Sequence, residues 1–340
     1  MRNALKWNEI VNADPAKTHV TKTFKHNSPL ISCRIEPTGK FVFAGAQDSK
    51  ILRWEIESGA KAELAGHKSW VRGIAFDPKS EWMVTGGYEG DLLWWPVAAE
   101  KPAATRTVKA HQGWVRAVTV SPDGTLIASC GNDNLVKLWK ADDGSALRTF
   151  AGHDRHVYNV AFHPSGKQIV SCDLMGNFIH WDVETGKQER KFAAPSMHKY
   201  DTTFRADIGG SRGMEFSDDG KLLACGGITN VSNAFAGVGN PIIVLFDWET
   251  GKEKIQHLAK GNIRGSIWGL AMHQQGFTIG GSGGGGGGLL FFWKPDQKNE
   301  FHKLKLPNTI KDLDLHPDGQ HIATAHHDSQ LRISKMAAKA

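Results

Sequence analysis

Cysteine is scarce in this sequence, and long apolar runs are absent. The four cysteines, Cys33, Cys130, Cys172 and Cys225, show no paired CxxC spacing of the kind found in zinc sites and dithiol redox centres. They fall within strand patterns, which predicts small core residues in a reducing compartment. No run of about 18 apolar residues occurs, which excludes an ordinary transmembrane helix, and residues 1–15 lack the apolar core of a signal peptide. We therefore expect a soluble, intracellular and cytoplasmic protein.

A strong excess of one charge is also missing. The chain has 41 basic and 35 acidic side chains, giving a net charge of +6 and a pI near 9.0. Nucleic-acid binding would require these charges to gather on one face, so composition alone does not argue for it. With 340 residues and 40% hydrophobic content, one domain with a large core is sufficient.

Residues 110–153 contain the clearest repeating pattern. Apolar and polar residues alternate over 115–120, 126–129 and 135–139, and the segments between them are rich in Pro, Gly, Asn and Asp. This is the pattern of short β-strands joined by tight turns. A fourth strand follows Asp142-Asp143-Gly144, and the pattern restarts at Gly152-His153. The unit is thus about 40 residues with four antiparallel strands.

A unit of this length, with an opening Gly-His and a closing Trp, resembles the WD-repeat β-propeller family. The resemblance implies that a His, a Ser or Thr, an acidic residue and the Trp of each unit form a hydrogen-bonded tetrad. In the second and third units these are His67, Thr85, Glu89, Trp95, His111, Ser129, Asp133 and Trp139. We interpret the set as structural rather than as a catalytic triad, because it recurs with the unit and includes the Trp.

The number of units follows from the turn sequences. In four units a Pro lies 11 residues after the opening His (His26, His67, His111 and His153). In the fourth unit Met175 holds the acidic position, which predicts an incomplete tetrad. Turns at 216–220 and 316–319 indicate a fifth and a seventh unit, with Phe246 and Ser334 in the Trp register, and residues 266–293 form a sixth unit with the glycines 283–288 as its turn. The fifth unit contains two insertions, 193–210 and 228–241.

The last unit lacks a fourth strand, and residues 20–26 mirror the fourth strand of the third unit. The predicted fold is therefore all-β: a seven-bladed β-propeller of four-stranded antiparallel blades, its ring closed by an N-terminal strand. We expect the propeller over residues 18–336, an N-terminal extension over 1–17 in which Trp7 packs down, and a tail over 337–340.

Several motifs suggest ligand chemistry but have simpler explanations. The glycines at 283–288 lack the Lys-Ser/Thr of a phosphate loop and precede a strand, so we expect a flexible turn. His326 and His327 are strand neighbours and point to opposite faces. His163, His273 and His316 begin the first turn of their units, where exposed polar residues are ordinary. We predict no metal and no cofactor.

The insertions and the glycine turn all belong to the loops of one face, here called the top, where a propeller usually binds its partners. The first strands should also present one residue each to the channel mouth on this face. These positions are Ile31, Arg72, Arg116, Tyr158, Arg212, Trp268 and Lys311, and Trp70, Trp114, His156 and Tyr88 lie beside them. Trp, Tyr and Arg dominate protein interfaces, and guanidinium groups suit carboxylates or phosphates.

We therefore predict a non-catalytic scaffold that binds a peptide or protein, expected to be acidic, on the top face. The candidate partner-binding residues are Trp70, Arg72, Tyr88, Trp114, Arg116, His156, Tyr158, Arg212, Trp268 and Lys311. The alternatives are a nucleic-acid-binding module and a propeller hydrolase, for which Asp201 and Asp207 are the only nearby acidic candidates. The expected assembly is a monomer or a subunit of a larger complex, without membrane attachment.

Overall fold

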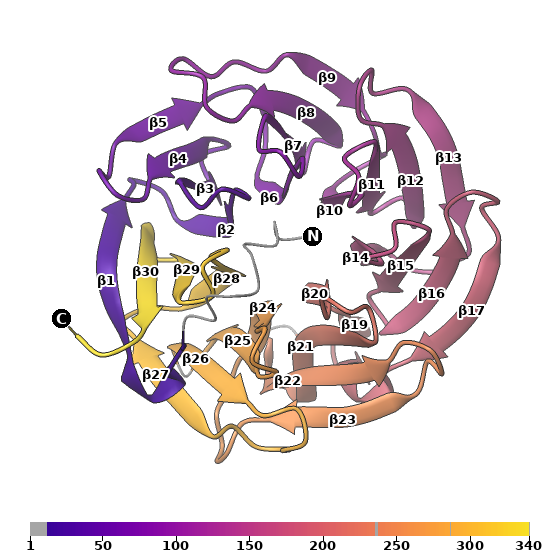
Figure 1. Ribbon diagram of the computed structural model, residues 1–340. Helices are drawn as coiled ribbons and strands as arrows, with labels where there is room; N and C mark the ends of the chain where they lie inside the picture. Colours follow the sequence, from indigo (N-terminus) through magenta and orange to yellow (C-terminus); the bar gives the residue numbers. More distant parts are fainter. Residues whose placement is uncertain (1–11, 235–236, 286, 340) are drawn as a thin grey trace.

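The computed structural model describes residues 12–234, 237–285 and 287–339. Seven four-stranded sheets stand around a central opening (Figure 1). The first strand of each sheet lies innermost, and every neighbouring pair within a blade is antiparallel. The predicted seven-bladed all-β propeller is thus confirmed.

The first four blades follow one another along the chain. Blade one holds β2 (Leu30–Ile35), β3 (Phe41–Ala46), β4 (Ile51–Glu55) and β5 (Lys61–Leu64). Blade two holds β6 (Val71–Phe76), β7 (Trp82–Gly87), β8 (Asp91–Pro96) and β9 (Arg106–Lys109). Blade three holds β10 (Val115–Val120), β11 (Leu126–Gly131), β12 (Leu135–Lys140) and β13 (Ala146–Ala151), and blade four holds β14 (Val157–Phe162), β15 (Gln168–Asp173), β16 (Asn177–Asp182) and β17 (Gln188–Ala193).

The remaining blades include the insertions and the closure of the ring. Blade five holds β20 (Gly213–Phe216), β21 (Leu222–Asn233), β22 (Val238–Asp247) and β23 (Glu253–Leu258), and blade six holds β24 (Ser266–Met272), β25 (Thr278–Gly283), β26 (Gly288–Trp293) and β27 (His302–Leu306). Blade seven combines β28 (Ile310–Leu315), β29 (His321–His326) and β30 (Gln330–Met336) with the N-terminal β1 (Thr18–Lys25). The predicted closure by an N-terminal strand is therefore correct.

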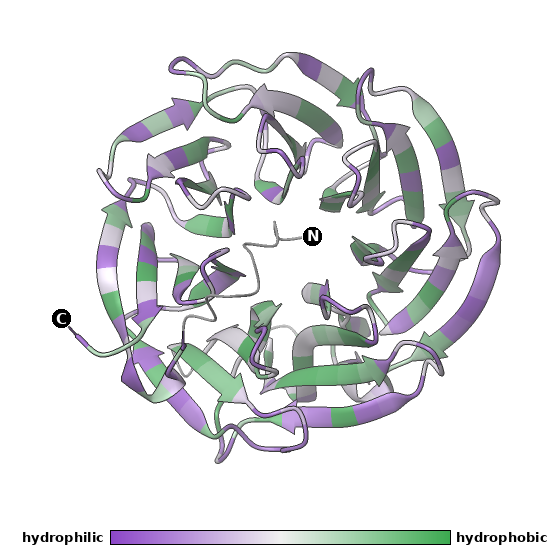
Figure 2. Ribbon diagram, viewed as in Figure 1, coloured by the Kyte–Doolittle hydropathy of each residue, from purple (hydrophilic) through white to green (hydrophobic). Residues whose placement is uncertain are grey.

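The apolar core lies between the blades. Seven clusters of buried side chains occur, and each is shared by two neighbouring sheets. The cluster at the closure joins Phe24 and Leu331 of blade seven to Leu30 and Trp54 of blade one. Figure 2 shows the apolar residues concentrated on strands such as β22, while outer strands such as β17 and β23 are mainly polar. Each sheet buries both faces against its neighbours, so one blade alone would leave apolar surface in water.

The turns have the hydrogen bonds that their residues favour. In the turn after β10, Ser121 Oγ donates to Asp123 Oδ1 (2.6 Å) and accepts from the Leu126 amide (2.9 Å). Gly124 has a φ of +77°, which only glycine adopts readily. These local bonds fix the hairpin and hence the register of the two strands.

The predicted tetrads of blades two and three are present. His111 contacts Asp133 Oδ1 (2.8 Å) and Ser129 Oγ (2.8 Å), and Trp139 Nε1 donates to Ser129 Oγ (2.9 Å). In blade two, the corresponding contacts join His67 to Glu89 and Thr85, and Trp95 to Thr85. The equivalent set is interrupted in blade one, where Ala44 replaces the hydroxyl residue.

The expectation of an incomplete tetrad in blade four is wrong. His153 contacts Ser171 Oγ (2.7 Å), and its other ring nitrogen lies 3.3 Å from Asp173 Oδ2. Asp173 is the last residue of β15, two positions before Met175, so the carboxylate reaches the imidazole from the strand instead of the turn. Trp181 Nε1 completes the set with a bond to Ser171 Oγ (2.9 Å).

The weaker registers also agree with the sequence. Phe246 pairs with Leu223 and Ser334 with Ile322, just as Trp139 pairs with Ile127. Cys33, Cys130, Cys172 and Cys225 are buried free thiols. The expected flexible glycine turn is shorter than predicted, because strands run through Gly283 and restart at Gly288. A Cβ at Gly288 would lie 1.9 Å from the Asn308 carbonyl oxygen, so this glycine allows close packing against the connection between β27 and β28.

Only two short helical turns occur in the described residues, η1 (Pro15–Lys17) and η2 (Pro195–Met197). No helix in this part of the chain has the length and apolar character needed to cross a membrane. Within the predicted extension 1–17, Ala13 is buried and the Asp14 amide donates to the Met336 carbonyl (2.8 Å). Trp7 lies outside the described residues.

Candidate functional site

The predicted mouth residues occupy one structural position. In six inner strands the pairing register shifts at this residue: Ile31, Arg72, Arg116, Tyr158, Trp268 and Lys311. In the remaining blade, blade five, Arg212 directly precedes the inner strand β20. A β-bulge leaves its extra residue unpaired and redirects its side chain. The repeated bulge explains how one sequence position supplies side chains to a common ring.

Four aromatic residues of blades two, three and four and one arginine among them form one surface, which we call the aromatic shelf: Trp70, Tyr88, Trp114, Tyr158 and Arg116. Tyr88 and Trp114 are stacked, with ring centroids 4.1 Å apart and planes inclined by 4°, and Trp70 lies 6.0 Å from Tyr88. The Arg116 guanidinium lies 4.5 Å from the Trp114 ring and 4.4 Å from the Tyr158 ring. Trp70 and Trp114 are each 41% exposed.

Arg116 has a defined orientation on this shelf. Its Nε donates to Asn132 Oδ1 (2.7 Å), and the rings on either side hold the guanidinium plane. His156 is exposed at the edge and lies 3.2 Å from Asn134 Oδ1. The shelf is therefore preorganised, which reduces the entropy lost on binding.

At the same mouth, residues of blades two, five and seven bring three cations against one indole ring of blade six. The charged groups of Arg212, Lys311 and Arg72 lie 4.4, 4.8 and 5.3 Å from the Trp268 centroid. We call Arg72, Arg212, Lys311 and Trp268 the cation cluster. Trp268 is itself oriented by a bond from Nε1 to the Gly283 carbonyl (3.3 Å).

The cations of the cluster destabilise one another's charged forms. Burial lowers the pKa of Arg212 to about 10, and Arg72 and Arg116 contribute in the same direction. Burial also lowers the pKa of Lys311, assisted by Arg72 and Arg212. Like charges in a partly desolvated site favour the arrival of an anion.

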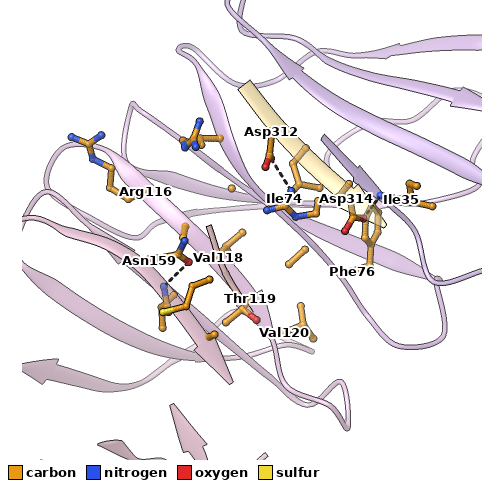
Figure 3. Close-up of a pocket in the computed structure, with 18 of the residues that line it drawn as sticks. Ile35, Ile74, Phe76, Arg116, Val118, Thr119, Val120, Asn159, Asp312 and Asp314 are labelled. Atoms are coloured by element: carbon orange, nitrogen blue, oxygen red, sulfur yellow. Dashed lines mark hydrogen bonds and ion pairs between the residues drawn. The ribbon is translucent and has the colours of Figure 1, made fainter. Parts of the chain in front are cut away.

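Below the mouth lies a central cavity of about 330 Å³. In Figure 3, Arg116 stands at one end of the cavity, and Phe76 and Val120 stand toward the other. Asp312 accepts from Arg34 (2.7 Å) and from the Cys33 amide (3.1 Å), and Asp314 accepts from the Ile35 amide (2.7 Å). These acidic groups already serve the contact between blades seven and one.

The two insertions of blade five contact one another. Residues 193–210 contain η2 and the hairpin of β18 (His198–Asp201) and β19 (Ala206–Gly209), whereas 228–241 extends the β21–β22 hairpin. Lys199 Nζ donates to the Val231 carbonyl (2.6 Å), linking the two. Tyr200 and Phe204 on the β18–β19 hairpin are 51% and 46% exposed. Sequence reasoning missed these two aromatic residues, because the surrounding polar residues suggested a plain loop.

The acidic residues of the first insertion are engaged in holding it. Asp201 accepts from the amides of Thr203 (3.0 Å) and Ala234 (3.0 Å). Asp207 contacts His198 (2.8 Å) and Arg155 (3.7 Å). Both carboxylates therefore have structural partners, so this pair gives no support to the hydrolase alternative.

The first-turn histidines are not ordinary exposed residues as expected. The Nε2 atoms of His163, His273 and His316 contact carbonyl oxygens of turn glycines in the next blade, at 3.1, 2.7 and 2.9 Å. The partners are Gly220, Gly319 and Gly39. These histidines link neighbouring blades, and His273 is only 6% exposed.

One of these turns also brings together His316, Asp318 and His321, whose ligand atoms lie within 4.8 Å of one another. Imidazole and carboxylate groups are ordinary metal ligands. However, both ring nitrogens of His316 already have partners, Gly39 and Asp318. His163 and His273 make the same link without such a cluster, so the link itself requires no metal. In blade seven, His326 is buried against Thr324 while His327 is exposed.

Comparison with known proteins agrees with the architecture. The family model described as "WD domain, G-beta repeat" matches residues 18–55, 60–95, 103–140, 144–182 and 299–333, which together exceed half of the chain. The chain is 26% identical over 122 residues to the small ribosomal subunit protein RACK1 of Drosophila melanogaster, covering 34% of this chain and 38% of that protein. It is 30% identical over 130 residues to periodic tryptophan protein 2 of Arabidopsis thaliana, covering 38% and 14%.

A third relative is the ribosome biogenesis protein WDR12 homolog of Trichoplax adhaerens, 30% identical over 106 residues, or 30% of this chain and 24% of that protein. The matches thus span well under half of each relative's length. They concern the repeats rather than the relatives as wholes. With the family model matched over most blades and the tetrads in place, the chain belongs to the WD domain, G-beta repeat family.

Proposed function

We propose that this protein is a non-catalytic interaction scaffold that holds an acidic peptide or protein loop across the top face of the propeller. Proteins of this family are typically interaction scaffolds in complexes. The observation that supports the top face most is the aromatic shelf, where Trp70 and Trp114 remain 41% exposed while stacked around Tyr88. Large exposed rings beside fixed cations are typical of binding surfaces.

In this proposal the shelf and the cation cluster make different contributions to binding. Stacked rings bury a large area without losing much side-chain entropy, because they are already ordered. Arg72, Arg116 and Arg212 supply positive charge at the mouth, which accelerates encounter with an acidic partner and excludes basic ones. The exposed Tyr200 and Phe204 extend this face over blade five.

The test measures the affinity of the full chain for fluorescent peptides of acidic, neutral and basic composition by anisotropy. We expect acidic peptides to bind, and Arg72→Glu with Arg116→Glu to weaken them at least about 100-fold because attraction becomes repulsion at two positions. The matched control is Lys79→Glu with Lys187→Glu, two exposed lysines in turns of the opposite face. Equal affinity of the two double variants would contradict the proposal.

A nucleic-acid-binding module is the alternative favoured by stacked rings beside arginines, since bases stack on such surfaces. The same assay with single-stranded oligonucleotides separates the two. Binding whose affinity falls steeply with salt, and exceeds that of the acidic peptides, would favour nucleic acid. That the protein is cytoplasmic, and that it is a monomer or a subunit of a larger complex, remain predictions.

A further inference from the structure

The cation cluster differs from the aromatic shelf in its charge balance. The charged groups of Arg72, Arg212 and Lys311 all lie within 5.3 Å of the Trp268 centroid. Across residues 12–234, 237–285 and 287–339, no ion pair joins any of these three to a carboxylate. The indole face offsets part of the charge through its quadrupole but provides no acceptor atom.

The nearest acidic residue along the chain does not neutralise the cluster. Asp312 follows Lys311 directly, but its carboxylate accepts from Arg34 (2.7 Å) and the Cys33 amide (3.1 Å). In addition, the Nε–H of Arg212 is buried without a hydrogen-bond partner in the described chain. A buried donor without a protein partner, within a group of like charges, favours the binding of an acceptor at this position.

We propose that Arg72, Arg212 and Lys311 form a subsite for a phosphate monoester dianion. A carboxylate carries one negative charge and two oxygens, whereas a phosphate monoester at neutral pH carries nearly two charges and three acceptor oxygens. Two guanidinium groups and one ammonium group match that charge and acceptor number more closely. The phosphate oxygens would also supply an acceptor for Arg212.

The neighbouring shelf indicates the source of the phosphate. Arg116 of the shelf lines the same central cavity as Arg72 and Arg212 of the cluster, so the two regions adjoin. A peptide lying on Trp70, Tyr88 and Trp114 could place a phosphorylated side chain at the cluster. This assignment rests on the proposed function, and it names the partner as a phosphorylated segment rather than a merely acidic one.

The first experiment titrates the full chain with inorganic phosphate and with acetate at constant ionic strength, using calorimetry and tryptophan fluorescence. We expect saturable phosphate binding that is at least about ten-fold tighter than acetate binding. Arg72→Met and Lys311→Met should each weaken phosphate about 10- to 100-fold, as the loss of a charge-assisted hydrogen bond predicts. Both positions are half-buried, and circular dichroism checks that each variant folds.

The matched control is Arg264→Met, which removes an exposed arginine from the loop that enters the same blade as Trp268. It should bind phosphate like the wild type. Absence of saturable phosphate binding, or equal losses in the control and cluster variants, would overturn the subsite.

A second experiment compares one peptide carrying phosphoserine, serine or aspartate at the same position. We expect the phosphoserine form to bind at least about ten-fold tighter than the aspartate form, with the difference lost in Lys311→Met. Equal binding of the three forms through Trp114 would overturn the subsite but leave the proposed function intact. Phosphate binding without any peptide binding would support the subsite for small phosphorylated molecules and contradict the proposed function.

Discussion

Replacement of Asp173 provides a direct test of the tetrad in blade four. Its side chain is buried and accepts from the amides of Met175 (2.9 Å) and Asn177 (3.0 Å) and from Asn177 Nδ2 (3.1 Å), and it faces His153 Nδ1 at 3.3 Å. Asp173→Ala leaves these four donors unpaired. At about 1 kcal/mol for each, the free energy of unfolding should fall by ~3–5 kcal/mol.

Urea denaturation followed by circular dichroism and tryptophan fluorescence measures this change. Burial raises the pKa of Asp173, but hydrogen bonds from His153 and Asn177 outweigh it and leave the pKa below the ordinary 3.8. A carboxyl group with a lowered folded pKa stabilises the fold above its ordinary pKa and loses this effect as the pH falls through the folded value. The difference between wild type and Asp173→Ala should therefore be constant near neutral pH and shrink below about pH 4.

A second substitution provides the decisive control. Met175 occupies the position that corresponds to Asp133 in blade three, so Met175→Asp should restore much of the stability lost in Asp173→Ala. In the wild-type background the same change should not stabilise, because Asp173 already serves His153. A loss below about 1 kcal/mol in Asp173→Ala would refute the reasoning.

Three further predictions concern the core, the closure and the shelf. His180→Leu should not lower the free energy of unfolding at neutral pH, because the buried His180 Nε2 has no partner in the described chain. Burial lowers the pKa of His180 to about 4. In urea titrations the wild type should therefore lose stability relative to the variant as the pH falls from about 6.5 to 4. Phe24→Ala should lower the free energy of unfolding by ~3–5 kcal/mol in the same assay, because Phe24 is buried at the closure and its ring stacks on Trp54 with centroids 5.7 Å apart. An unchanged urea midpoint would show that β1 contributes little to the closure of the ring. Trp114→Ala should change the free energy of unfolding by less than about 1 kcal/mol but weaken acidic-peptide binding at least about ten-fold, because the ring is exposed. Parallel losses of stability and of peptide affinity would contradict the shelf as a docking surface.

Much of the architecture was accessible from the sequence because it depends on local rules. Two-residue alternation, turn residues and the spacing from His111 to Trp139 specify four strands per unit. The closing strand was visible because residues 20–26 repeat the pattern of an outer strand that the last unit lacks. Seven similar sheets can bury their faces only against one another, so repetition leads to a ring.

Other features depended on side chains that approach from distant parts of the chain. The contact between Asp173 and His153 could not be predicted from register alone, because a carboxylate two residues away reaches the same imidazole. The histidine links between blades need the carbonyl of the next blade, which lies 57 residues further on for His163 and Gly220. Sequence position indicated only that these histidines begin a turn.

Periodicity and repeat spacing were enough to predict the fold, the number of blades and the inner-strand positions that form the ring. The division of that ring became visible only in three dimensions, where Arg116 lies between the Trp114 and Tyr158 rings and the cations of Arg72, Arg212 and Lys311 lie against Trp268. The bulges aim the side chains toward the mouth, but the distances between blades determine which cations lie against the Trp114 and Tyr158 rings and which lie against Trp268.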